Sequence, residues 1–196
     1  MKPLISVVLA GLIWTSSTCV GWAQDARRLP GEDDLAFAAR ALRLPKASEP
    51  KVTAALWNGR QTLFVEYLTP DQEPERPLVA LLPDGAGYRS VQVTIGEQEG
   101  GTPDIAAIGF ANADRDPVRE LIVILAWQVN HYDVGGTAYE VRIFDDAKPG
   151  EAMLTPLNVD KDFAYGCACG WRDGREQDYR YKTIASVKAR LRALGY

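Results

Sequence analysis

Short strand-like runs separated by tight-turn signals fill most of this 196-residue chain. From residue 52 onward apolar side chains recur with a period of two, which is typical of β-strands that bury one face. Asn58-Gly59, between the first two runs, is a strong signal for a two-residue hairpin turn. The pattern therefore predicts a mainly β fold built from antiparallel hairpins. We expect strands at 52–57, 61–68, 78–82, 88–95, 105–111, 120–129 and 138–144, and a weak strand at 153–159.

A helix is expected at each end of this β-rich part. Residues 32–44 carry acidic side chains in the first turn and arginines near the end, an order that suits the helix dipole, and Pro45 stops the helix. Thr183 can cap a second helix that Gly195 is placed to end. Both helices have one apolar face, which predicts that they pack on the sheet. For the second helix, a basic surface that binds a membrane or a partner is the alternative.

The N-terminus has the pattern of a secretory signal peptide. Lys2 precedes an apolar run at 4–14, and Gly21 and Ala23 supply the small side chains that a signal peptidase requires. The run is shorter than the roughly 20 apolar residues that span a bilayer. We therefore expect cleavage after Ala23 and a periplasmic or secreted protein. A buried first helix or strand is the alternative.

Removal of residues 1–23 divides the rest into a helix and linker at 24–50 and a single β-rich domain at 51–196. The net charge of −4 becomes −5, because Lys2 is the only charged residue removed. A mildly acidic protein gains no counterion-release affinity for phosphate backbones, so nucleic acid is not an expected partner. The mature chain has no second apolar segment long enough to span a membrane.

An acidic turn between two apolar runs is the stretch most informative about function. Side-chain oxygens recur there at alternate residues, and one backbone carbonyl continues the spacing. Calcium takes six to eight oxygen ligands, and alternate residues of a tight loop can converge on one ion. The candidate Ca²⁺ ligands are Asn112, Asp114, Asp116, the carbonyl of Val118, and Glu120.

This region resembles the FG-GAP/VCBS repeats of integrin-like β-propellers over about residues 78–145. In that family an aspartate-rich calcium loop precedes a strand of the Leu-Ile-Val kind, as residues 121–123 are here. Residues 82–88 resemble the preceding hairpin and residues 139–144 the following strand. A propeller needs at least four blades of about four strands, and this chain has strands for about two. We expect a blade-like antiparallel sheet or a small sandwich, not a complete propeller, covered by the terminal helices.

The turn departs from the family's loop at three positions. Asn112 stands where Asp is usual, and Arg115 and Pro117 stand where Gly is usual. Proline fixes φ at about −65°, whereas Gly often supplies a positive φ. The alternative is an acidic turn in which Asp114 or Asp116 accepts backbone hydrogen bonds or pairs with Arg115 or Arg119. A guanidinium then takes the place of the metal.

Cys167 and Cys169 are the only cysteines of the mature chain, because Cys19 lies in the signal peptide. In an oxidising compartment two nearby thiols tend to oxidise, so a disulfide is expected between them. Such a small ring is more reducible than a long-range bridge. Binding of a soft metal by two thiolates and catalytic redox chemistry are the alternatives. The spacing is not the C-x-x-C of thioredoxin-like enzymes.

The only histidine, His131, is expected at a hairpin tip beside Tyr132 and Asp133. With Trp127 from the preceding run, these residues are candidate ligand contacts. One histidine cannot furnish a His-rich zinc site, and a His-assisted nucleophile needs a serine or cysteine beside it in space. The sequence contains no phosphate-binding loop, dinucleotide fingerprint or hydrolase nucleophile motif.

These features together predict an exported, non-enzymatic binding module, with an ion at the 112–120 turn and an envelope or secreted protein as partner. The alternatives are a periplasmic enzyme, either a hydrolase or a thiol-dependent catalyst, and an inhibitor of a secreted hydrolase. A concave pocket that gathers His131 with Cys167 or with two carboxylates favours the enzyme. A dispersed arrangement of these groups favours binding.

Overall fold

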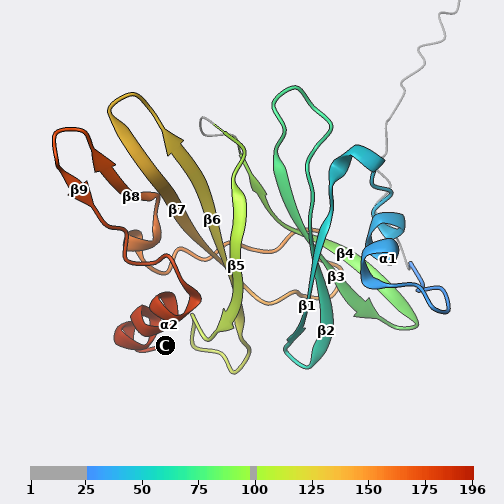
Figure 1. Ribbon diagram of the computed structural model, residues 1–196. Coiled ribbons are helices and arrows are strands. Elements are labelled where there is room, and N and C mark those ends of the chain that lie inside the picture. Colours follow the sequence, from blue (N-terminus) through green and yellow to red (C-terminus); the bar gives the residue numbers. More distant parts are fainter. Residues whose placement is uncertain (1–25, 98–100) are drawn as a thin grey trace, which may run out of the picture.

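Two antiparallel sheets packed face to face make up the body of the protein (Figure 1). The computed structural model describes residues 26–97 and 101–196. The proposed signal peptide lies outside these residues. The mainly β fold expected from the sequence is confirmed, and its two sheets form a small sandwich.

Both sheets are meanders, in which each strand pairs antiparallel with the next one along the chain. The first sheet contains β1 (Lys51–Trp57), β2 (Arg60–Glu66), β3 (Arg76–Asp84) and β4 (Gly87–Gly96). The second contains β5 (Asp104–Ala111), β6 (Glu120–Asn130), β7 (Val134–Phe144), β8 (Gly166–Trp171) and β9 (Glu176–Gln177). The hairpin predicted at Asn58-Gly59 is confirmed: both residues have a positive φ, and Trp57 pairs with Arg60 across the turn.

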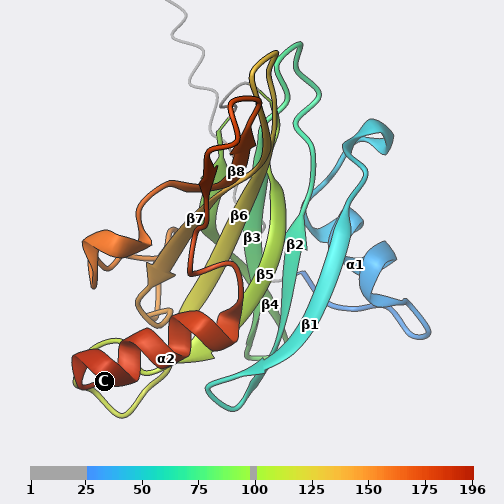
Figure 2. The same cartoon turned by 60° about the vertical axis from the view of Figure 1, so that its left-hand side comes forward.

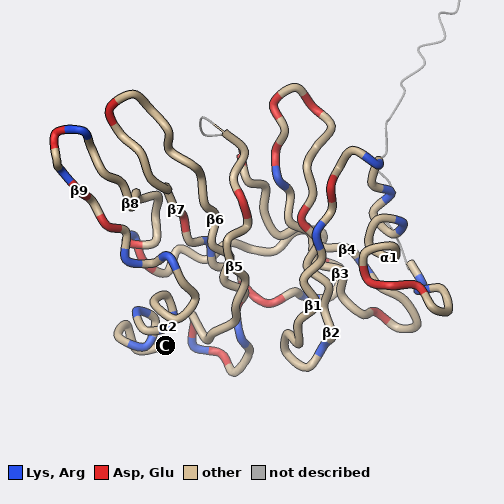
Figure 3. The backbone as a smooth tube through the Cα atoms, viewed as in Figure 1, with Lys and Arg blue, Asp and Glu red and all other residues tan. Residues whose placement is uncertain are grey.

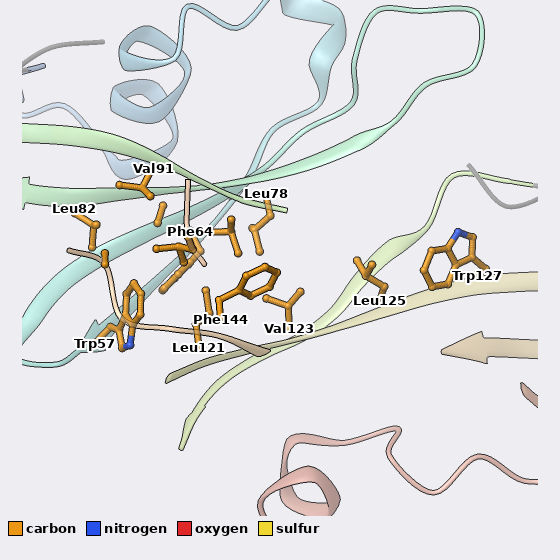
Figure 4. Close-up of a cluster of buried hydrophobic side chains, with 14 of the residues drawn as sticks. Trp57, Phe64, Leu78, Leu82, Val91, Leu121, Val123, Leu125, Trp127 and Phe144 are labelled. Carbon is orange, nitrogen blue, oxygen red and sulfur yellow. The ribbon is translucent and has the colours of Figure 1, made fainter. Parts of the chain in front are cut away.

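The main core lies between the two sheets (Figure 4). Phe64 of β2, Leu78 of β3 and Val91 of β4 face Val123 of β6 and Phe144 of β7 across it. Successive side chains of a strand point to opposite faces of the sheet, which is why one side of each sheet can enter a common core.

β6 is buried on both of its faces. Leu121, Val123 and Leu125 face the main core, whereas Ile122 and Ile124 belong to a second cluster on the opposite side of the sheet. Helix α2 (Ile184–Leu194) lies beside the second sheet (Figure 2). It covers that second cluster together with aromatic side chains from the segments around it. The residues that cover it include Phe163, Tyr179, Tyr181, Val187 and Leu191.

The terminal helices cover the two outer faces, as predicted. Helix α1 (Asp34–Ala41) places Phe37 and Ala38 against Leu63 and Val65 of the first sheet. It is shorter than the predicted 32–44. At α2 the predicted caps are confirmed. The Thr183 side chain accepts a hydrogen bond from Ser186 N, and Gly195 ends the helix with a φ of 94°. In the described ranges, neither helix has the length and apolar character needed to cross a membrane.

The prediction of a strand at 153–159 is wrong. That segment makes only isolated bridges, at Met153 and Pro156, and runs along the edges of β4 and β7. Proline has no N–H to donate to a ladder, so it interrupts regular pairing there. The strands β8 and β9, which the sequence pattern did not predict, form the far edge of the second sheet instead.

Gly136 of β7 lies so close to β8 that no side chain fits. A Cβ atom there would stand 2.3 Å from the carbonyl oxygen of Ala168 and 2.8 Å from the Cα of Cys169, and φ is +150°. We therefore expect Gly136→Ala to lower the free energy of unfolding by about 3 kcal/mol, measured by urea denaturation. Gly135→Ala is the matched control. Its Cβ would meet only the Val129 carbonyl oxygen, at 3.9 Å, so its cost should stay below about 1 kcal/mol. Equal stability of the two variants contradicts the tight β7–β8 contact.

Candidate functional site

The outer edge of β7 has a gap in its hydrogen-bond ladder. β8 pairs with this edge only as far as Tyr139. Farther along β7, the Leu157 amide donates to the Ile143 carbonyl at 2.8 Å. Between these two points the partner chain leaves the edge as residues 158–165, which include the 3-10 turn η2 (Lys161–Phe163). This excursion uncovers part of a buried strand.

Val141 is the residue whose backbone faces the gap. The Ile143 carbonyl points outward, and backbone direction alternates along a strand, so the Val141 N–H and C=O also point away from β6. A continued β8 register would pair Val141 with Ala164, but the Ala164 amide donates to Lys161 O at 3.2 Å instead. No strand pairing of the described chain reaches Val141 on this side, although its side chain is buried.

A hollow of about 840 Å³ opens at this gap. It is lined by residues 92–95 of β4, residues 140–144 of β7 and most of the segment 153–164. The lining is largely apolar, and the volume lies in the range of about 300–1,000 Å³ usual for ligand sites.

Polar contacts from Arg190 and Tyr179 hold the excursion in place. Arg190 of α2 forms an ion pair with Asp160, with Nε 2.5 Å from Oδ2, and this pairing holds the pKa of the Asp160 carboxyl below its usual value. The Tyr179 hydroxyl donates to the Phe163 carbonyl at 3.1 Å. The hollow thus has a wall that is tied to the body of the protein.

Arg142 spans the two sheets beside the hollow. Its guanidinium donates to Thr94 Oγ1 at 2.6 Å and to Ile95 O at 2.7 Å, both on β4. It also forms ion pairs at 2.9 Å with Glu140 and with Glu97. Burial by itself lowers the pKa of Arg142, but the hydrogen bonds to Glu140 and Glu97 raise it above its usual value. Two carboxylates therefore surround one permanently charged guanidinium.

A smaller hollow of about 370 Å³ continues the first one past Arg142. Both share the lining residues Glu97, Glu140, Arg142 and Ala164, and the smaller one adds Trp127 and Tyr165. The two aromatic rings lie 5.9 Å apart between centroids, and Tyr165 is 56% exposed. We call the two hollows together the β4–β7 groove.

The predicted metal ligands lie apart from this groove, in the loop between β5 and β6, where acidic and basic residues alternate (Figure 3). Asp114 and Asp116 come together there with Asp145, and carboxylate oxygens of the three lie within 4.8 Å of one another. Sequence reasoning missed Asp145. The β6–β7 register, in which Leu121 pairs with Phe144, brings it beside the turn.

The turn also makes the backbone hydrogen bonds that the alternative interpretation expects. Asp114 Oδ1 accepts from Asp116 N at 2.8 Å, and Asp116 Oδ1 accepts from Val118 N at 2.7 Å. The Asn112 side-chain amide donates to Asp116 O at 2.5 Å. No ion pair of Arg115 with these aspartates is found in the described chain.

Glu120, the fifth predicted ligand, is fully buried at the start of β6. Its Oε2 accepts hydrogen bonds from the backbone amides of Ala113 and Asp114, and its Oε1 has no partner in the described part of the chain. Burial raises the pKa of this carboxyl, and the amide of Ala113 opposes that rise. Glu120 therefore closes the turn onto the sheet and lies outside the three-aspartate cluster.

The four candidate ligand contacts occupy two separate places. Trp127 lines the β4–β7 groove, with its indole N–H donating to Glu97 O at 3.1 Å. His131, Tyr132 and Asp133 line a hollow of about 320 Å³ at the tip of the β6–β7 hairpin. Among the described residues that line this second hollow, Asp133 is the only carboxylate and none is a cysteine.

Cys167 and Cys169 are joined by a disulfide within β8. Their Cα atoms lie 5.3 Å apart. Cys169 is buried, and Cys167 packs against the main core. Bonded in this way, neither sulfur is a thiolate that can act as a nucleophile or metal ligand.

The disulfide predicts a definite alkylation pattern. Protein that lacks residues 1–23 should take up no alkyl group under denaturing conditions without reductant, and two after reduction, as measured by intact mass. A Cys167→Ser, Cys169→Ser double variant is the control that takes up none in either case. Two additions without reductant contradict the bond.

Comparisons of the chain with models of known families, with curated proteins and with solved structures find no match. The resemblance to FG-GAP/VCBS repeats therefore stays a prediction.

Proposed function

We propose that this protein is an exported binding module that holds part of an envelope or secreted protein in the β4–β7 groove. The gap in the ladder of β7 carries this proposal. It combines a largely apolar hollow, a backbone edge without a strand partner and a charged cluster in one place. Binding sites typically join an apolar lining to a few polar groups of this kind.

The scatter of the reactive side chains supports binding over catalysis. His131 lies at a hairpin tip, in a hollow that shares no lining residue with the groove. The cysteines are bonded to each other. A hydrolytic or thiol-dependent mechanism needs a base beside a nucleophile, and these groups are not placed in that way.

The disulfide supports the proposed location. Disulfides persist in oxidising compartments such as the periplasm, where a protein carrying a signal peptide is delivered. The bond lies in β8, the strand at which the pairing of β7 stops. β8 therefore contains the disulfide and also borders the β4–β7 groove.

We further propose that Asp114, Asp116 and Asp145 hold a calcium ion that fastens the β5–β6 loop to the end of β7. Carboxylate oxygens are ligands that calcium prefers. Lys148 forms an ion pair with Asp145 at 2.5 Å. Burial acts to raise the pKa of the Asp145 carboxyl, but this pairing holds it below its usual value. Burial raises the pKa of the neighbouring Asp146, and the charges of Asp145 and Asp116 raise it further.

Calcium should accordingly stabilise the protein. Millimolar CaCl₂ is expected to raise the Tm by about 5 °C relative to EDTA, because an ion that binds only the folded state stabilises it. Asp116→Asn and Asp145→Asn should each remove this rise, whereas the matched control Asp133→Asn should keep it. A full rise in Asp145→Asn contradicts the proposed ligand set.

Filling the groove should weaken partner binding. Ala164 lines both hollows and is exposed, so Ala164→Phe adds a ring at the groove without burying new volume in the core. We expect this variant to bind the partner captured from envelope extracts about tenfold more weakly, which corresponds to about 1.4 kcal/mol of binding free energy.

Ala189→Phe, on the exposed face of α2, is the matched control and should capture the partner as the unchanged protein does. Equal capture by the two variants contradicts the groove as the binding site.

A further inference from the structure

We propose that the occupant of the β4–β7 groove is an extended peptide segment in which an apolar residue is followed directly by a basic one. This inference rests on the proposed function and names the chemistry of its partner. The segment forms a short antiparallel bridge with Val141 and places its basic side chain beside Glu140 and Glu97.

The backbone of Val141 sets the first requirement. Its N–H and C=O face the gap and have no backbone partner there among the described residues. A backbone group that loses water to a ligand without gaining a hydrogen bond costs free energy. A peptide residue opposite Val141 supplies one acceptor and one donor, as in recognition by strand addition. β8 pairs antiparallel with this edge, and the bridge between Phe144 and Pro156 at the other end of the gap is also antiparallel. We therefore assign the antiparallel direction to the peptide.

The length of the gap limits the contact to about three residues. Pairing with β8 ends at Tyr139, and pairing with the crossing segment resumes at Ile143. Only residues 140–142 of β7 lie between these points. The peptide can therefore pair with β7 over these residues only. The pairings on either side leave no room for a longer added strand.

The two faces of β7 determine which side chains fit. Val141 belongs to the same side of the sheet as Ile143 and Phe163, so the peptide residue opposite Val141 meets apolar neighbours. Residues directly opposite each other in a ladder put their side chains on the same face. In an antiparallel bridge the next peptide residue stands opposite Glu140, on the other face.

The charge around Glu140 selects a basic side chain at that next position. Glu97 and Glu140 together exceed the single positive charge of Arg142, and the Glu97 side chain is 56% exposed. Asp160 and Lys161 line only the larger hollow, and their opposite charges offset each other there. The negative excess therefore lies where Glu97, Glu140 and Arg142 line both hollows, next to the aromatic end. The exposed ring of Tyr165 there adds a cation–π surface.

The test is a titration of ¹⁵N-labelled protein with acetyl-Ala-Leu-Lys-amide, followed by NMR. We expect the Val141 amide resonance to move in proportion to occupancy. Acetyl-Ala-Lys-Leu-amide has the same composition with leucine and lysine exchanged, and it should bind at least about threefold more weakly. The peptide in which norleucine replaces the lysine lacks the positive charge and should be weakened by a similar factor. Methylation of the leucine nitrogen removes the donor to the Val141 carbonyl and should weaken binding by a similar factor.

Protein variants test the charge step. Glu97→Gln should remove the preference for lysine over norleucine, measured as the ratio of the two affinities. Glu66→Gln, a carboxylate of the first sheet outside the groove, is the matched control and should keep that preference. The dispersed amide spectrum of each variant shows that it is folded.

The outcomes separate this inference from the function on which it rests. Equal binding of the lysine, norleucine and reversed peptides overturns the inference. It is also overturned if hexylammonium binds as tightly as the lysine peptide and leucine N-methylation has no effect, because the occupant is then a small amine. If no peptide binds but Ala164→Phe still loses its envelope partner, the inference fails and the proposed function stands.

Discussion

The double-sided burial of β6 is the constraint on which the rest of the structure depends. Its residues 121–125 have no exposed surface. Each buried leucine or isoleucine side chain contributes about 1.5–3 kcal/mol, but only if both faces of the sheet are covered. The first sheet covers one face, and α2 with the aromatic residues near it covers the other. The burial of β6 therefore requires both the first sheet on one side and α2 on the other.

Polar contacts at the margins fasten the two sheets to each other. At one margin Trp57 and Asn58 of the first hairpin donate to the Arg119 carbonyl, at 2.7 and 2.9 Å. At the other margin the Arg142 guanidinium reaches across to Thr94 and Ile95. The second margin also carries the groove, so the contact that closes the sandwich supplies the charge of the candidate site.

Local signals in the sequence were enough to predict much of this fold. The Asn58-Gly59 turn, the caps of α2, the alternation along β4 and the continuous apolar run of β6 depend on neighbouring residues alone. β8 could not be found in this way. Its sequence, Gly166-Cys167-Ala168-Cys169-Gly170-Trp171, has no β-branched side chain, and it is held as a strand by its pairing with β7.

The candidate site depends still more on distant contacts. Asp145 joins Asp114 and Asp116 through the register of a hairpin, which no spacing within the acidic turn can reveal. The groove arises because residues 158–165 leave an edge to which the chain is anchored on both sides. Trp127 was identified as a candidate from its residue type. It lines the groove, whereas His131 lines the hollow at the tip of the β6–β7 hairpin, and the sequence alone does not show that the two places are separate.

The excursion at 158–165 also has an evolutionary consequence. Its two ends are fixed by independent pairings, and it contains more residues than the short length of β7 that it bypasses. Insertions and substitutions in such a surface segment leave the ladder on either side intact. The architecture therefore separates the sandwich, whose pairings tolerate little change, from the wall of the β4–β7 groove, which can vary in length and sequence.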